Sequence, residues 1–214
     1  IVFQLTISYL LMARNVKTEG LILKNTRFAE IHKSVTFLSP DLGVVNAIAH
    51  GAYKGKSKLG GVTEMFSRSL ISLYHNPVKS SHKITEVEPI SYYDTLRTDL
   101  EKFYIASLWS EVILRTYAGG GDFGEVYTLC CNAMELLDRS PAKRNDTTLA
   151  FFLFEYVDLL GYLPDFSFCA RCGRKLEEES AWYVGDGGSI YCSRCAGDGL
   201  PVLTVGARRC LAYA

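Results

Sequence analysis

Four of the seven cysteines in this 214-residue chain have the spacing of metal ligands. Cys169 and Cys172 form one C-x-x-C pair, and Cys192 and Cys195 form a second pair after 19 intervening residues. Two tight turns joined by a short hairpin would bring four thiolates together, which is a tetrahedral set that suits Zn²⁺. Such a closed site has no open position for a reacting water, so we predict structural zinc. A redox role or an iron–sulfur cluster is the alternative, although the usual cluster spacings are absent.

A glycine-rich loop carries the second candidate chemistry. The segment GAYKGKSKLGG at residues 51–61 holds four glycines and has Lys54, Lys56 and Lys58 at alternate positions. Flexible point charges of this kind suit contact with nucleic-acid phosphates. Further predicted DNA contacts are Lys17, Lys24 and Arg27, and Lys33 and Arg68 add to the charge of the same third of the chain. The alternative is a solvated loop that lysine keeps soluble.

Charge is segregated along the chain even though the total is zero. Residues 12–90 contain 11 Lys and Arg against 6 Asp and Glu, whereas residues 91–165 contain 6 against 12. A basic module followed by an acidic module indicates two modules with different partners. The cysteine pattern is unlike that of a small secreted disulfide scaffold, so we expect a reducing, intracellular compartment.

Other chemistry-bearing residues give weaker patterns. Phe28, Tyr53 and Phe66 could stack on bases, although aromatic side chains at such positions more often pack in a core. The four histidines, at positions 32, 50, 75 and 82, lie near predicted strand ends without a metal or triad partner at a recognisable spacing. Cys130 and Cys131 fall among apolar residues and fit core packing. Because no nucleophile–base pattern is present, the sequence offers no positive case for an enzyme.

The elements that would position these residues change type along the chain. Five β-rich segments with turn signals between them predict a small closed barrel of the OB type, at 16–24, 32–39, 44–50, 66–74 and 84–90. Between the two cysteine pairs, segments 182–184 and 190–191 predict a hairpin. A final helix is expected from Val205, and the helical part is expected to be truncated at the C-terminus.

Three helices are predicted between the barrel and the cysteine module. Ser91–Asp94 has the form of a capping box and would open the first helix, which Gly119–Gly121 ends. Asp122 opens the second, and Ser140-Pro141 ends it. A third begins at Asn145 or Asp146. It is apolar nearly all round from residue 149 to 160, which predicts a position at the centre of a bundle.

The first eleven residues contain no charge and lack the basic start of a signal peptide. We expect Met12 to be the real start, with residues 1–11 dispensable upstream sequence. No other segment is long enough to cross a membrane.

The stretch TEGLILKNTRFAEIHKSVTFLSPDLGVVNAIAHGAYKGKSKLGG at residues 18–61 resembles the OB-fold opening of the bacterial RecO family. The run Gly161-Tyr162-Leu163-Pro164-Asp165, followed by Cys169-Ala170-Arg171-Cys172-Gly173, is similar to the family's entry into its zinc module. The resemblance implies a cytoplasmic, nucleoid-associated protein that is not an enzyme. It would bind single- and double-stranded DNA, anneal strands, and help RecR load RecA onto DNA coated by single-strand-binding protein.

The combined prediction is an α+β protein in three parts. Residues 12–90 would form an OB-fold DNA-binding domain, and residues 91–214 a helical domain with a zinc module at 166–200. The function predicted is a mediator of recombinational DNA repair. A rival hypothesis is a zinc-stabilised protein-interaction scaffold whose barrel binds a protein or peptide. An enzyme that uses the zinc is a third option, and the four-sulfur site argues against it.

Overall fold

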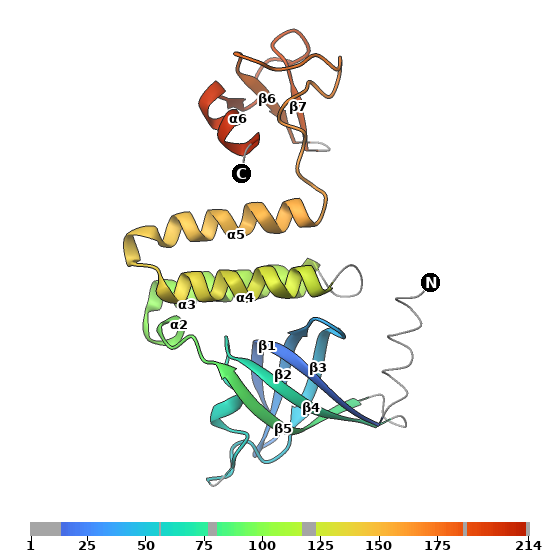
Figure 1. Cartoon of the computed structure of the whole chain (residues 1–214), viewed down its shortest axis with the longest axis vertical. Coiled ribbons are helices and arrows are strands. Elements are labelled where there is room, and N and C mark those ends of the chain that lie inside the picture. Colours follow the sequence, from blue (N-terminus) through green and yellow to red (C-terminus); the bar gives the residue numbers. More distant parts are fainter. Residues whose placement is uncertain (1–13, 56, 77–80, 117–122, 186–187, 213–214) are drawn as a thin grey trace. The chain divides into compact units, whose positions relative to one another are not determined.

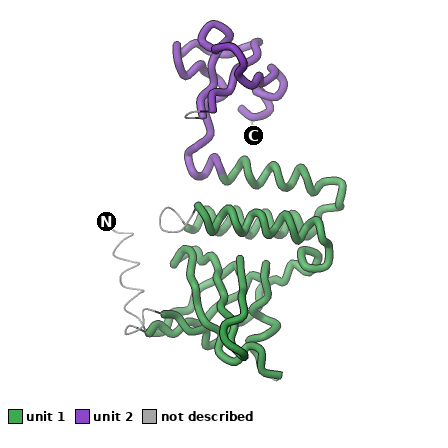
Figure 2. The backbone as a smooth tube through the Cα atoms, turned by 180° about the vertical axis from the view of Figure 1, so that it is seen from behind, with its two compact units in different colours: residues 1–156 green, residues 157–214 purple. Residues whose placement is uncertain are grey.

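The computed structural model describes residues 14–55, 57–76, 81–116, 123–185 and 188–212 (Figure 1). The expectations for residues 1–11, for Lys56, for the triple glycine and for Asp122 lie outside these ranges. The chain divides into two compact units, one ending at Tyr156 and the other beginning at Val157 (Figure 2). Each unit is described by itself below.

A closed five-stranded barrel forms the first part of unit 1, as predicted. Its strands are β1 (Asn15–Phe28), β2 (His32–Ser39), β3 (Gly43–Ala49), β4 (Arg68–Asn76) and β5 (Ser81–Ser91). The order around the barrel is β1-β2-β3-β5-β4, in which only the β3–β5 pairing is parallel. This is the arrangement of a Greek-key OB barrel, so the predicted fold class is confirmed.

Strand β1 closes the barrel because it is long enough to pair on both sides. Its first half pairs with β4, and from Leu21 onward it pairs with β2. A register shift between Ile22 and Lys24 marks the bend. At Gly20 a Cβ atom would lie 2.6 Å from the ring of Phe37 and 2.7 Å from Ile71. The glycine therefore lets two core side chains meet over the strand where it turns.

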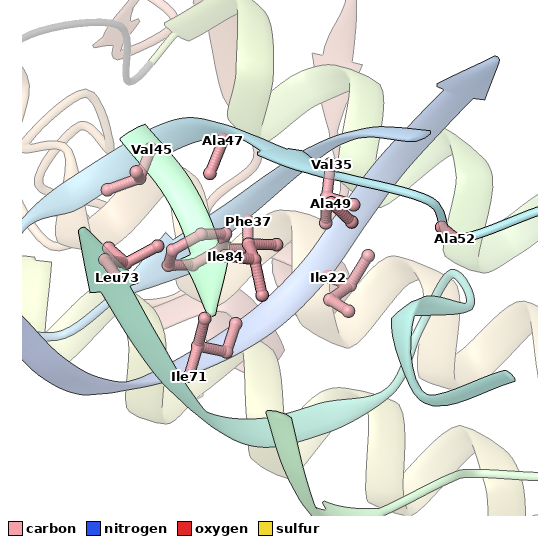
Figure 3. Close-up of a cluster of buried hydrophobic side chains, with 10 residues drawn as sticks. All are labelled: Ile22, Val35, Phe37, Val45, Ala47, Ala49, Ala52, Ile71, Leu73 and Ile84. Carbon is pink, nitrogen blue, oxygen red and sulfur yellow. The ribbon is translucent and has the colours of Figure 1, made fainter. Parts of the chain in front are cut away.

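The barrel interior holds the apolar side chains of all five strands (Figure 3). Inward and outward residues alternate over most of β2, β3 and β4, which explains the period-two pattern in the sequence. The largest members of this core are Ile22, Phe37, Ile71, Leu73 and Ile84, each at most 1% exposed.

Helices follow the barrel, and several of their details differ from the prediction. They are α2 (Thr95–Thr98), α3 (Leu100–Thr116), α4 (Phe123–Arg139) and α5 (Asn145–Leu159), with the short 3₁₀ turn η2 (Ala142–Arg144) before α5. Another 3₁₀ turn, η1 (Gly61–Thr63), lies between β3 and β4. The predicted first helix is interrupted at Asp99, whose backbone is extended. The capping box is also wrong, because Asp94 makes no side-chain cap hydrogen bond. Instead the Asp138 carboxylate of α4 accepts the Thr95 backbone N–H at 2.9 Å.

The expectation that α5 lies at the centre of a bundle is wrong for the described residues. Within α5 only Asn145, Thr148, Phe152 and Tyr156 are buried, and Phe151 is 47% exposed. Phe152 packs on Trp109 of α3 with the ring centroids 4.6 Å apart. The helix therefore packs by one i, i+4 stripe, and its apolar residues on other faces do not imply full burial.

The barrel and the helices meet at a polar junction. Glu19 of β1 accepts hydrogen bonds from Arg68 of β4, at 2.6 and 3.1 Å, and from the Tyr127 hydroxyl of α4, at 3.0 Å. The Arg68 guanidinium also lies 5.8 Å from the Tyr127 ring centroid. Nearby, Gly43 has φ +70°, and a Cβ there would lie 2.6 Å from the Phe123 ring at the start of α4. Charge and close packing together hold α4 against the barrel.

Unit 2 contains the cysteine module and the last helix. Its elements are β6 (Ala181–Val184), β7 (Ser189–Tyr191), β8 (Val202–Leu203) and α6 (Val205–Ala212). The three strands form one antiparallel sheet in the order β7-β6-β8. The hairpin between the cysteine pairs and the helix from Val205 are confirmed, whereas β8 was not predicted.

Replacing Glu19 with Gln tests the junction. Arg68 lowers the pKa of the Glu19 carboxyl below its ordinary 4.5, although partial burial opposes this and Tyr127 assists. Because the folded-state pKa is the lower one, the carboxylate stabilises the fold above the ordinary pKa, and its contribution disappears as pH falls through the folded-state value. Both side chains of the pair are about one-third exposed, so we expect Glu19→Gln to cost about 1 kcal/mol of unfolding free energy at pH 7.

Urea unfolding at neutral and acidic pH measures this contribution. Wild type and Glu19→Gln should converge in acid, where both side chains are neutral. Glu30→Gln, in the exposed turn between β1 and β2, is the matched control and should leave stability unchanged at both pH values. A difference between Glu19→Gln and wild type that persists in strong acid would contradict the ion-pair explanation.

Candidate functional site

The two cysteine pairs come together in unit 2 as predicted. The sulfur atoms of Cys169, Cys172, Cys192 and Cys195 all lie within 4.8 Å of one another. The Cys172 and Cys192 sulfurs are 3.8 Å apart, which is about the 3.8 Å edge of a tetrahedron with zinc–sulfur bonds near 2.3 Å. The donor set and its dimensions are therefore compatible with a zinc site.

Each pair sits on a turn that aims both thiols at the same point. The Gly173 N–H donates to the Cys169 carbonyl at 2.8 Å, and the Cys195 N–H donates to the Cys192 carbonyl at 3.0 Å. Gly173 has φ +69°, which the first turn requires and which glycine adopts without strain. Between the pairs, the Cys192 N–H also donates to the Cys169 sulfur at 3.4 Å.

Electrostatics in the cluster act in opposite directions on two of the cysteines. Burial opposes ionisation of Cys192, but hydrogen bonds, first that from Arg174, lower its pKa to about 6. Burial and the three neighbouring sulfurs raise the pKa of Cys195 to about 12. Cys192 therefore ionises first, and Cys195 keeps its proton beside the other sulfurs. A divalent cation at the centre would relieve the repulsion between the sulfurs and displace the proton.

A buried arginine joins α6 to this module. Arg208 is only 3% exposed and donates to the carbonyl oxygens of Phe166 at 2.8 Å, Glu177 at 2.7 Å and Glu179 at 3.3 Å. The final helix therefore packs on the cysteine module within unit 2. No sequence pattern pointed to Arg208, because a lone arginine in a helix is ordinarily a surface residue.

Both ends of the basic loop are anchored to the barrel. Ala52 is buried in the barrel core, and the Tyr53 N–H donates to the Ile31 carbonyl at 3.1 Å. Lys33, at 2% exposure, reaches under the loop to the Gly60 carbonyl at 3.0 Å and the Glu64 carboxylate at 2.9 Å. Lys33 is therefore an internal anchor and does not add to the exposed charge, contrary to the sequence interpretation.

The predicted DNA contacts fall into two groups: exposed cations at the loop end of the barrel, and cations that lie near a carboxylate. Arg27, Lys54 and Lys58 are exposed, and the Arg27 guanidinium lies 4.9 Å from the ring centroid of Tyr53. Lys17, near the other end of β1, donates to the Glu88 carboxylate at 2.6 Å. Lys24 is exposed; it helps to lower the pKa of the Glu111 carboxyl of α3, after the larger effect of Arg115. Arg68 is held by Glu19, so its charge is also compensated.

Two exposed aromatic rings, those of Phe28 and Tyr53, lie near the exposed Arg27. Phe28 is 50% exposed and Tyr53 is 43% exposed, so both have surface available for stacking. Phe66 is fully buried and meets Phe103 edge-on at 5.6 Å, so the idea that it stacks on bases is wrong. The register of β1, β2 and β3 aligns Arg27 with Lys33 and Ala49, which places Phe28 and the start of the loop at one end of the barrel.

The histidines form two pairs that their sequence separation concealed. His32 and His50 have ring centroids 4.6 Å apart, and those of His75 and His82 are 4.9 Å apart. Strand register brings each pair together: β2 and β3 for the first, β4 and β5 for the second. The first pair lines an open hollow of about 380 Å³ with Gly51, Lys54 and Ser57. Only the barrel topology could reveal this grouping.

Within the described ranges, no helix has the length and apolar character needed to span a membrane.

The fold and the site define an OB-barrel protein with a four-cysteine module, and OB barrels commonly bind oligonucleotides. Residues 12–93 match the family described as "Recombination protein O N terminal", and residues 97–205 match "Recombination protein O C terminal". Together these matches extend over most of the sequence. The chain belongs to the recombination protein O (RecO) family.

Several curated relatives are longer than this chain. A DNA repair protein RecO of Roseiflexus sp. is 29% identical over 184 residues, which cover 86% of this chain and 63% of the relative. The protein of the same name in Desulfatibacillum aliphaticivorans is 29% identical over 204 residues, covering 90% and 76%. That of Nostoc punctiforme is 30% identical over 180 residues, covering 81% and 59%.

Substitution of Arg208 tests its role as the anchor of α6. In Arg208→Met three carbonyl groups, that of Phe166 in a buried setting, lose their donor, so we expect a loss of about 2–4 kcal/mol for opening of α6. Hydrogen exchange read by mass spectrometry should show faster exchange in residues 205–212 and unchanged exchange in β1–β5. Arg209→Met changes the neighbouring exposed residue, which pairs with Glu178, and should leave protection intact. Equal protection in the two variants would disprove the anchor.

Proposed function

We propose that this chain is a non-enzymatic DNA-binding protein that mediates recombinational repair, with residues 12–90 as its DNA-binding domain. Membership of the RecO family supports the general role, and the names of the relatives denote DNA repair. The observation that carries the proposal is the grouping of exposed cations and exposed aromatic rings at one end of an OB barrel. Backbone charge contacts and base stacking are the two interactions that such barrels use on single strands.

Arg27, Lys54, Lys56 and Lys58 are the proposed principal phosphate contacts. Phe28 follows Arg27 in the chain and Tyr53 contacts the Arg27 guanidinium, and both offer ring faces that stack on any base. Lys17 and Lys24 remain in the proposed set, with a smaller share because carboxylates of Glu88 and Glu111 lie near them. Contacts of this kind do not depend on the base sequence of the DNA, which suits a protein that must act on many DNA sites.

The remaining part, residues 91–214, is proposed as a protein-docking domain that includes the zinc module at 166–200. Residues 91–165 carry the acidic charge excess, so DNA would be repelled from this part of the chain. Along α3 the exposed Leu100, Tyr104 and Leu108 recur every four residues and form an apolar stripe. The proposed partners are RecR and single-strand-binding protein, with RecA served indirectly, and the proposed activities are strand annealing and RecA loading.

The four cysteines are proposed to hold structural zinc. Unit 2 is small, and a metal bound there would contribute directly to its folding. When bound, the ion would cross-link the two turns, and Arg174 would offset part of the negative charge of the thiolates.

Removing the loop lysines tests DNA binding. We expect Lys54→Ala/Lys56→Ala/Lys58→Ala to flatten the slope of log K against log salt by about 2, at roughly 0.7 per lost single-strand contact. Affinity should fall by a similar factor for every base sequence. The measurement is fluorescence anisotropy with labelled single strands at several salt concentrations.

The matched control for this test removes three exposed cations of the acidic part. Arg139→Ala/Lys143→Ala/Arg144→Ala changes the net charge equally and should keep the wild-type slope. If wild type binds no DNA, the proposed function fails, and the rival scaffold, in which the barrel binds a protein or peptide, takes its place. A wild-type salt slope in the loop variant would remove the three lysines from the interface.

Removing a thiol tests the zinc proposal. Cys172→Ala and Cys192→Ala should each lose zinc, measured by elemental analysis of reduced protein, and should melt at lower temperature. Cys210→Ala changes an exposed cysteine of α6 outside the cluster and should keep both metal and stability. Absence of zinc in freshly purified wild type, or unchanged melting of both ligand variants, would refute it.

A further inference from the structure

We propose that the hollow lined by His32, His50 and Lys54 binds one phosphate of the DNA backbone and takes up a proton as it does so. This inference rests on the proposed DNA-binding function and assigns one particular subsite within it. A histidine pair can bind a metal cation as well as an anion. The hydrogen-bond donors and the charges around the hollow decide between these two ligands.

Every polar side chain that lines the hollow can donate a hydrogen bond outward. The His32 Nδ1 atom accepts the Gly51 N–H at 2.9 Å, so neutral His32 carries its proton on Nε2. The Ser57 hydroxyl oxygen accepts the Leu59 N–H at 3.2 Å and keeps its own proton for another acceptor. Lys54 adds an exposed ammonium group. With three such donors and no carboxylate among the described lining residues, the hollow favours an anion.

The charges around the hollow also exclude a metal cation. Lys54 lies on its rim, and Lys83 of β5 pairs in register with Ile48, two residues before His50. No carboxylate is among the described residues that line it. Beneath the loop, Glu64 is engaged by Lys33, and Arg27 lies over Tyr53. With Nδ1 of His32 already occupied, the pair could offer a metal few ligands in a positive field.

The two histidines have different parts in the proton uptake. The Nδ1 atom of His32 is already occupied by the Gly51 N–H, so this ring offers only its Nε2 N–H to the phosphate. His50 has no such constraint and is exposed at the end of β3. Partial desolvation, then the nearby His32 and Lys83, lower the pKa of His50 below its ordinary 6.5. Free protein at neutral pH therefore presents neutral His50.

A bound phosphate reverses this balance. Its negative charge favours imidazolium over imidazole and raises the pKa of His50 in the complex. Linkage then requires that DNA binds more tightly as pH falls through the range between the free and bound pKa values. Protonated His50 also becomes an additional phosphate contact, so the salt dependence of binding should steepen over the same range.

The test measures anisotropy of labelled oligo(dT) at pH 7.5 and pH 5.5, with several salt concentrations at each pH. Neither thymine nor the phosphodiester titrates in this range. Wild type should bind about threefold to tenfold more tightly at pH 5.5, with a salt slope steeper by about 0.7. His50→Gln should bind like wild type at pH 7.5 and show no gain at pH 5.5.

Two further variants keep the test decisive. His50→Lys carries a permanent charge and should bind at pH 7.5 as tightly as wild type does at pH 5.5, a gain that an unfolded variant could not show. His75→Gln/His82→Gln removes the other histidine pair and should retain the wild-type response. An excess of inorganic sulfate at matched ionic strength should reduce the pH response if a free anion fills the same hollow.

The outcomes separate this inference from the function on which it rests. DNA binding that is strong but independent of pH would overturn the proton-linked subsite and leave the proposed function intact. A pH response that survives in His50→Gln would also overturn it. Failure of wild type to bind oligo(dT) at either pH would overturn both.

Discussion

Barrel closure through β1 is the constraint on which the rest of unit 1 depends. Because this strand pairs with β4 along one half and with β2 along the other, the sheet has no open edge at that point. The bend brings Gly20 beneath Phe37 and Ile71, where a larger residue would collide with both. The same closure puts Glu19 diagonally across from Arg68, which pairs in register with Leu21, and thereby creates the ion pair that receives α4. Closure of the barrel through β1 therefore also forms the junction with α4.

The positive charges of the chain are divided between internal support and the surface. Lys33, Arg68 and Arg208 each satisfy carbonyl or carboxylate oxygens inside the protein, and Lys102 of α3 does the same at the Asp138 carbonyl. A buried cation left without such partners would be costly, which explains why each has several. Arg27 and Lys54 have no carboxylate partner in the structure as described. Charge counting alone therefore overstates the surface available to DNA.

Local sequence patterns predicted most of the helices and strands. The features that the sequence did not reveal depend on contacts between residues far apart in the chain. The five strands, the cysteine hairpin and the four-thiol cluster follow from alternation, turns and spacing, all of which act over a few residues. The histidine pairs require strands to meet in register, and the anchoring role of Lys33 requires the loop to fold back over β2. The error at α5 has the same cause, because an apolar composition does not say how many neighbours a helix has.

Unit 2 shows why polar and sulfur interactions must substitute for a core in a small module. Its buried apolar residues are few: Phe166, Leu176, Ala181 and Ile190, apart from the cysteines. A module of this size ordinarily buries too little surface to offset the entropy of ordering its chain. The hydrogen bond from the Cys192 N–H to the Cys169 sulfur joins the two cysteine turns. Arg208 ties α6 to three segments of backbone, so the last helix is held by hydrogen bonds where a larger domain would use apolar packing.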